Sequence, residues 1–177
     1  FGDSKSPREK AAMETLRRLH PRYERAVMAF VREDPAQAYR MAIDAARIVK
    51  AGLPVVLAVL HDRAGGTVRH VRELAAHLQD TALFLTLTPA PNRYVRLEMA
   101  TKNEGFGLVF HLQDQFLDLV DVLQRLGVRH IHYHHLLGHE IAVMDLPAQL
   151  GVDYDFTAHD YYSYCTNISL TGRDNRY

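Results

Sequence analysis

Apolar positions follow two different periods along the chain. Through residues 7–50 they recur every three or four positions, which predicts amphipathic helices, and Gly52 ends this stretch. Residues 55–60 are instead consecutively apolar and rich in valine, as in a strand that is buried on both faces of a parallel sheet. The pattern therefore predicts a helical N-terminal extension, residues 1–52, followed by an α/β domain, residues 53–177.

Strands and helices alternate along this second region. Further strands are predicted near residues 83–88, 94–99, 107–112, 128–133 and 154–158, and further helices near residues 67–78, 116–126 and 140–150. This alternation predicts a mainly parallel sheet with helices on both faces, because a parallel connection has to cross over the sheet. Ligands of such sheets bind beyond the carboxyl ends of the strands. The turns at residues 61–66, 134–138 and 159–162 follow such ends.

The first of these turns carries two adjacent glycines, Gly65 and Gly66, directly before a predicted helix. Glycine lets the backbone turn sharply and lets a ligand come close. Thr67 is the expected N-cap of the helix, whose free N–H groups and positive dipole end favour an anion such as a phosphate. The alternative is a tight connection without a ligand, since two glycines are fewer than a dinucleotide fingerprint contains.

Histidines crowd into the second turn and the strand before it. The chain has eleven histidines, and five of them lie within ten residues: His130, His132, His134, His135 and His139. Alternation along a strand would place the first three on one face, and neutral imidazole is a common zinc ligand. No nearby cysteine or His-Glu-x-x-His pattern completes a site. We therefore expect no bound metal, with one or two histidines in the cleft and the others packing or capping.

The third turn combines an imidazole, a carboxylate and two phenols. His159, Asp160, Tyr161 and Tyr162 follow the last predicted strand. An imidazole beside a carboxylate can hold a sugar hydroxyl or a developing charge by hydrogen bonding. Tyrosines are common in carbohydrate sites because they cover the apolar face of a sugar ring while their hydroxyls bond its edge. Structural capping by Asp160 is the alternative reading of these residues alone.

Composition narrows the class of protein. The chain has 177 residues, 47% of them hydrophobic and 24% charged, which is enough for a substantial core. Basic and acidic residues balance at 21 each, so no net field favours nucleic acid. No apolar run approaches the roughly 20 residues that cross a bilayer. The single cysteine, Cys165, excludes an internal disulfide and fits a reducing compartment, so we expect a cytoplasmic protein.

Three segments carry a resemblance to a known family. In order, they are Gly65-Gly66-Thr67-Val-Arg-His70-Val-Arg-Glu73-Leu-Ala, then His132-Tyr-His134-His135-Leu-Leu-Gly138, then Leu150-Gly-Val-Asp-Tyr-Asp-Phe-Thr157-Ala-His159-Asp160-Tyr161-Tyr162 with Cys165. Together, across residues 54–177, they resemble the N-terminal domain of family 4 glycosyltransferases, which have the GT-B fold. The resemblance implies a Rossmann-like, acceptor-side half of an enzyme with two such halves.

Enzymes of this family transfer a sugar from a nucleotide-sugar donor to a carbohydrate or lipid-linked acceptor, with retention of configuration and without a metal or other cofactor. The resemblance implies that residues 65–67 face the donor phosphates. It makes His159 and Asp160 the catalytic candidates, close to the transferred sugar. The acceptor side of the cleft would be lined by four side chains that follow strands: His134, His135, Tyr161 and Tyr162.

The chain reaches Tyr177 without a second, nucleotide-binding half. We therefore expect it to transfer no sugar by itself. Two other classes of function stay open at this point. One is a metal-dependent hydrolase that uses the histidine cluster, and the other is a non-catalytic binding module on the same fold.

Overall fold

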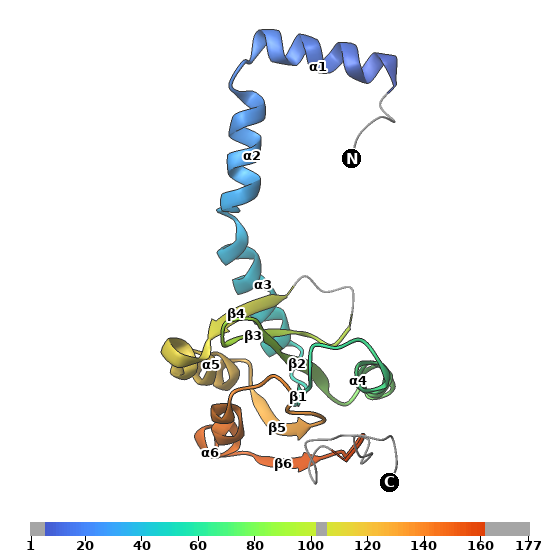
Figure 1. Ribbon diagram of the computed structural model, residues 1–177, viewed down its shortest axis with the longest axis vertical. Helices are drawn as coiled ribbons and strands as arrows, with labels where there is room; N and C mark the ends of the chain where they lie inside the picture. Colours follow the sequence, from blue (N-terminus) through green and yellow to red (C-terminus); the bar gives the residue numbers. More distant parts are fainter. Residues whose placement is uncertain (1–5, 102–105, 162–177) are drawn as a thin grey trace, which may run out of the picture. The chain divides into compact units, whose positions relative to one another are not determined.

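The computed structural model describes residues 6–101 and 106–161 (Figure 1). The chain forms two compact units, Phe1–Arg40 and Met41–Tyr177, and the division falls within helix α3 (Gln37–Lys50). None of the helices in the described part of the chain is long and apolar enough to cross a membrane.

The first unit contains helices α1 (Pro7–Leu19) and α2 (Tyr23–Glu33). Helix α1 begins with a capping box, in which the Ser6 hydroxyl accepts the Glu9 backbone N–H and the Glu9 carboxylate accepts the Ser6 N–H. Neither helix has a buried residue. Residues 7–50 are thus helical apart from the turns between helices, as their apolar periodicity predicts.

The second unit is built on a sheet of six strands in the described residues. They are β1 (Val55–Val59), β2 (Leu83–Ala90), β3 (Tyr94–Met99), β4 (Gly107–His111), β5 (Val128–Tyr133) and β6 (Asp153–Phe156), in the spatial order β4-β3-β2-β1-β5-β6. The four strands β2, β1, β5 and β6 are mutually parallel, whereas β3 and β4 pair antiparallel at one edge. The prediction of a mainly parallel sheet is confirmed.

The antiparallel edge follows from a short connection. Only three residues separate β2 from β3, and two of them, Asn92 and Arg93, have left-handed backbones with φ of 59° and 63°. Such a tight turn returns the chain beside the strand that it has just left, whereas a parallel partner requires a long crossover. The hairpin therefore forms where strand and helix alternation is interrupted.

Helices cover both faces of the sheet, as predicted (Figure 1). On one face, α5 (Leu112–Arg125), the short helix α6 (Leu146–Leu150) and the end of α3 pack against β1, where Leu57 is fully buried. On the other face, α4 (Gly66–His77) packs against Ala58 and Leu60. Strand β1 is therefore buried on both faces, which explains its uninterrupted apolar sequence.

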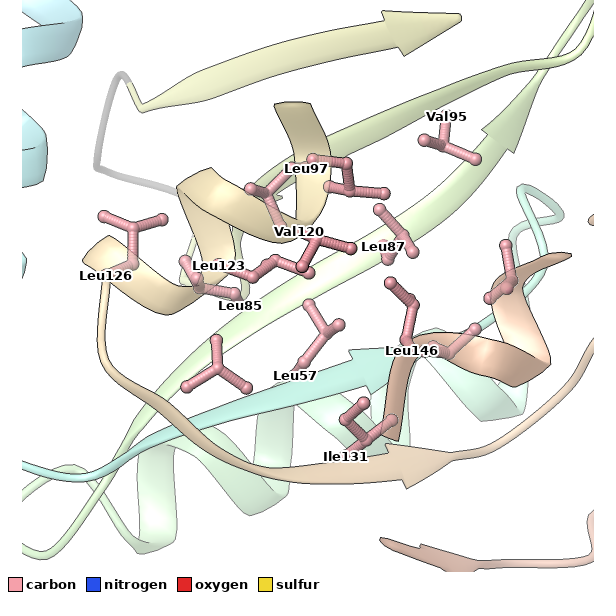
Figure 2. Close-up of a cluster of buried hydrophobic side chains, with 14 of the residues drawn as sticks. Leu57, Leu85, Leu87, Val95, Leu97, Val120, Leu123, Leu126, Ile131 and Leu146 are labelled. Atoms are coloured by element: carbon pink, nitrogen blue, oxygen red, sulfur yellow. The ribbon is translucent and has the colours of Figure 1, made fainter. Parts of the chain in front are cut away.

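The larger core lies between the sheet and α5. Figure 2 shows Leu57, Leu85 and Ile131 from three adjacent strands pointing toward Leu123 of α5 and Leu146 of α6. All five side chains are fully buried. Residues from the antiparallel edge and from the parallel strands share this cluster, so both parts of the sheet depend on one core.

One detail of the helices differs from the sequence-based predictions, and a second agrees with the restart that Pro147 predicts. The prediction of Thr67 as the N-cap of α4 is wrong, because the helix begins at Gly66 and the Arg69 N–H already bonds the carbonyl of Gly65. The predicted helix at residues 140–150 is divided into a 3-10 turn, η1 (Ile141–Asp145), and α6. Pro147 lies in the first turn of α6, where its missing N–H leaves no helical bond unmade.

Replacing Leu57 by alanine should lower the free energy of unfolding by about 2–5 kcal/mol, because it opens a cavity where the strand meets α5. Urea denaturation measures the change. The matched control is Leu117→Ala on α5, whose side chain is 71% exposed and whose loss should change stability by less than about 0.5 kcal/mol. Equal effects of the two substitutions would contradict the packing described here.

Candidate functional site

The strand order reverses direction beside β1. From β1 the chain moves to β2 on one side, and it later returns to place β5 on the other side of β1. Loops that follow β1 and β5 therefore separate at the carboxyl edge of the sheet, which is where open α/β sheets bind ligands. All three candidate turns, which follow β1, β5 and β6, meet at this edge.

Backbone hydrogen bonds fix the turn after β5 to the end of β1. The Val59 carbonyl accepts the N–H groups of both His134 (2.8 Å) and His135 (3.3 Å). The His139 Nε2 atom lies 3.0 Å from the Leu60 carbonyl and donates to it. These bonds hold the histidine-rich turn against the central strand, so the directions of its side chains are set by the sheet.

Three histidines from three segments form the centre of the site. His134 Nδ1 and His159 Nε2 lie 3.1 Å apart. The centre of the His70 ring, on α4, lies 5.5 Å from the centre of the His134 ring and 5.3 Å from that of the His159 ring. His134 is 1% exposed, whereas the other two face solvent. We call these three residues the histidine triad.

Sequence analysis did not select His70. The candidate list came from residues that follow strands, whereas His70 lies in the first turns of the helix after the glycines. A signal was present in the spacing, because His70 follows Gly66 by about one helical turn and must therefore stay near the strand ends. Only the packing of α4 against the end of β1 shows that it meets the other two rings.

A hydrogen-bonded pair, His135 and Asp160, lies beside the triad. His135 Nδ1 accepts the Leu137 N–H at 3.0 Å, so its other nitrogen carries the proton and donates to the Asp160 carboxylate at 3.1 Å. The ring of His61, from the turn after β1, meets the His135 ring at 4.9 Å. His135 is buried, and Asp160 therefore anchors it.

The remaining histidines of β5 belong to a row that faces Asp155. His130 Nε2 lies 3.1 Å from the Asp155 carboxylate, and His132 bonds the Thr157 hydroxyl at 2.7 Å. The rings of His132 and His134 are 3.9 Å apart, in agreement with the predicted common face.

An irregularity in β5 sets which face of the sheet this row occupies. The register with β1 passes from Val55 opposite Val128 to Val56 opposite His130, so Arg129 is an extra residue in the strand. Such a bulge changes which face the following residues occupy. It allows Val128 and Ile131 to enter the same core while the histidines face α4.

Burial keeps the centre of the site neutral. Desolvation, with a smaller effect of the neighbouring histidines, lowers the pKa of His134 to about 3. Burial also lowers the pKa of His159 and of His132. Within the described residues, His134 Nε2 is buried and has no hydrogen-bond partner. The site therefore offers uncharged ring nitrogens, which suit hydroxyl groups or a metal ion better than they suit a free anion.

A groove of about 680 Å³ opens beside the glycine turn. It runs between α4 and the β2–β3 hairpin, and its charged lining comprises Asp62, Arg63, Arg69, Arg72, Glu73, Arg96 and Glu98. Gly65 lines the groove, but Gly66 and the buried Thr67 do not. His61 lines it as well and connects it to His135.

The other site candidates are placed as follows. Tyr161 is exposed, and Tyr162 lies outside the described residues. The structure thus joins His134 with His159 and His135 with Asp160, while the glycine turn opens onto a separate groove.

Comparisons of the chain with models of protein families, with curated proteins and with solved structures found no match. Its function is therefore argued from these residues.

Gly138→Ala should destabilise the histidine-rich turn. Gly138 has a φ of +86°, and an added Cβ would lie 3.0 Å from Pro89 Cγ. Left-handed strain costs about 1 kcal/mol, and the steric conflict should add about 1–3 kcal/mol. The control is Gly127→Ala, where φ is +77° and the space is open. Urea unfolding should show a larger loss for Gly138→Ala, and equal losses would mean that Pro89 does not confine the turn.

The depressed pKa of His134 predicts acid sensitivity. The unfolded state binds a proton near pH 6.5, whereas the folded state does so only near pH 3, so stability is constant above pH 6.5 and falls as the pH decreases toward 3. The slope from this residue is about 1.4 kcal/mol per pH unit. The measurement is urea unfolding at several pH values from about 7.5 to about 5. Over this range the free energy of unfolding should fall less with decreasing pH for His134→Gln than for the parent protein. His77→Gln, at an exposed position of α4, should retain the parent slope.

Proposed function

We propose that the α/β unit is the Rossmann-like, acceptor-side half of a retaining glycosyltransferase with the GT-B fold. The observation that carries the proposal is that three distant segments of the chain meet at one edge of the sheet. The three segments that resemble family 4 glycosyltransferases are far apart in the sequence, yet His70, His134 and His159, one from each segment, lie in contact at the carboxyl edge of the sheet. The strand-order reversal supports a ligand site at the same place.

The proposed chemistry uses neutral hydrogen-bonding groups. In the transfer, the bond between the anomeric carbon and the donor phosphate breaks, an acceptor hydroxyl oxygen forms the new bond, and its proton passes to the leaving phosphate. Positive charge develops on the sugar and negative charge on the leaving phosphate. Desolvation lowers the pKa of His159, so its uncharged and solvent-facing ring can bond a sugar hydroxyl without repelling the positive sugar.

The leaving phosphate would be stabilised beside the glycine turn. The N–H groups at the start of α4 and the guanidinium groups of Arg63 and Arg72, both in the groove lining, supply positive potential there. Arg69 is less available, because its guanidinium pairs with Glu73 at 2.7 Å. Asp160 would act by holding His135, which in turn contacts His61 at the entrance to the groove.

Catalysis would need a second domain on the opposite side of the cleft. A transfer reaction requires donor and acceptor to be held together, and groups from both halves of the cleft contribute to binding and to transition-state stabilisation. We therefore expect the 177-residue chain alone to bind nucleotide sugars weakly and to transfer none. Robust turnover by this chain would contradict the division of the site between two halves.

In an enzyme that contains both halves, His159→Ala should lower kcat about 100- to 1000-fold and change KM much less, because the ring bonds the sugar most strongly in the transition state. Steady-state kinetics with a nucleotide-sugar donor measure this, and circular dichroism verifies folding. The control is His130→Ala, whose ring contacts Asp155 rather than the triad and whose loss should leave kcat nearly unchanged. A folded His159→Ala enzyme with parental kcat would remove this residue from the site.

The same assays distinguish a non-catalytic binding module. Such a module would bind a sugar or nucleotide sugar at this edge, and His159→Ala would weaken binding. No transfer would occur in any assembly of the two halves. Detection of a transferred sugar with retained anomeric configuration is therefore the decisive result for the proposed class.

A further inference from the structure

We propose that His70, His134 and His159 bind a divalent transition-metal ion of the zinc, nickel or copper type. One ring nitrogen from each of the three lies within 4.8 Å of the others. This inference goes beyond the proposed function and does not depend on it, because metal binding is measured directly. The site differs from the histidine row of β5 considered in the sequence, since two of its three residues lie outside that strand and the turn that follows it.

The geometry is close to what a metal ion requires. Tetrahedral coordination at a metal-to-nitrogen distance of about 2.0–2.1 Å places ligand nitrogens about 3.3 Å apart. His134 Nδ1 and His159 Nε2 are already 3.1 Å apart. His70 is exposed, so a modest side-chain rotation can bring its nitrogen to the same spacing. Metal binding would replace one histidine-to-histidine hydrogen bond by coordinate bonds to both rings.

The backbone around the triad is fixed before a metal binds. The His134 N–H donates to the Val59 carbonyl. Thr157, two residues before His159, donates its N–H to the Tyr133 carbonyl. The third ligand lies on a regular helix. Within the described residues, the other ring nitrogen of His134, Nε2, is buried without a partner, so a metal ion on Nδ1 would have no hydrogen bond behind it to orient the ring.

The ligand set indicates both the kind of ion and the strength of binding. Three imidazoles suit zinc, copper and nickel, whereas magnesium and calcium prefer oxygen ligands. Three protein ligands leave a coordination position for water or a small ligand. His134 and His159 bond each other, rather than each bonding a carboxylate through this pair of nitrogens. Carboxylate partners usually strengthen metal binding, so we expect reversible occupancy rather than a resident cofactor.

The test is titration of the purified 177-residue chain, after removal of metals with a chelator. Calorimetry with Zn²⁺ and visible absorption with Co²⁺ should both give one ion per chain, and the cobalt spectrum should show nitrogen-rich coordination. His70→Ala and His159→Ala should each weaken binding at least about tenfold. His134 is avoided as the main variant, because its substitution disturbs a buried position.

Two controls make the result decisive. His77→Ala removes an exposed histidine from the same helix and should leave affinity unchanged, and Mg²⁺ should not compete with Zn²⁺. One ion per chain with loss in both triad variants supports the site. Binding that persists in folded His70→Ala and His159→Ala proteins, or no binding at about 0.1 mM Zn²⁺ (a free energy near −5.5 kcal/mol), overturns it.

Discussion

Two backbone carbonyls at the end of β1 organise the candidate site. The Val59 carbonyl accepts two consecutive N–H groups, and the Leu60 carbonyl accepts the ring of His139. Because these bonds fix the backbone of the turn, His134 is directed to the triad and His135 to Asp160. Through the backbone of its last residue, the central strand therefore determines where two neighbouring imidazoles lie.

The same strand also contributes to the neutral state of His134. Its apolar residues are buried on both faces, and His134, which is bonded to its last residue, is itself buried. Desolvation keeps the pKa of His134 far below its usual value, and the neighbouring rings add to this effect. A site that held phosphate by charged histidines would need a wetter environment. In this chain, positive charge is instead found in the groove beside α4, where Arg63 and Arg72 remain close to solvent.

Local sequence patterns predicted most of the fold and some of the residues that the candidate site brings together. The buried strand, the glycine turn and the helix spacing of α5 are local properties, and the structure has all three. The hairpin formed by β2 and β3 was not predicted, because strand direction depends on left-handed residues in a three-residue turn. His70 was missed for a related reason, since its role comes from packing between segments that are distant in sequence. The division between the groove and the triad likewise depends on tertiary packing.

The bulge at Arg129 determines which face of the sheet each later residue of β5 occupies. Side chains of a strand alternate between faces, so one extra residue exchanges the faces of everything that follows it. With Arg129 present, the histidines face α4 and Ile131 enters the core with Leu57. If the same sequence paired with β1 one residue to one residue, without the bulge, the imidazoles would turn into the apolar layer beneath α5 and Ile131 would leave it. Loss of Arg129 itself should leave both faces as they are, because the remaining residues of β5 would then pair with β1 without interruption.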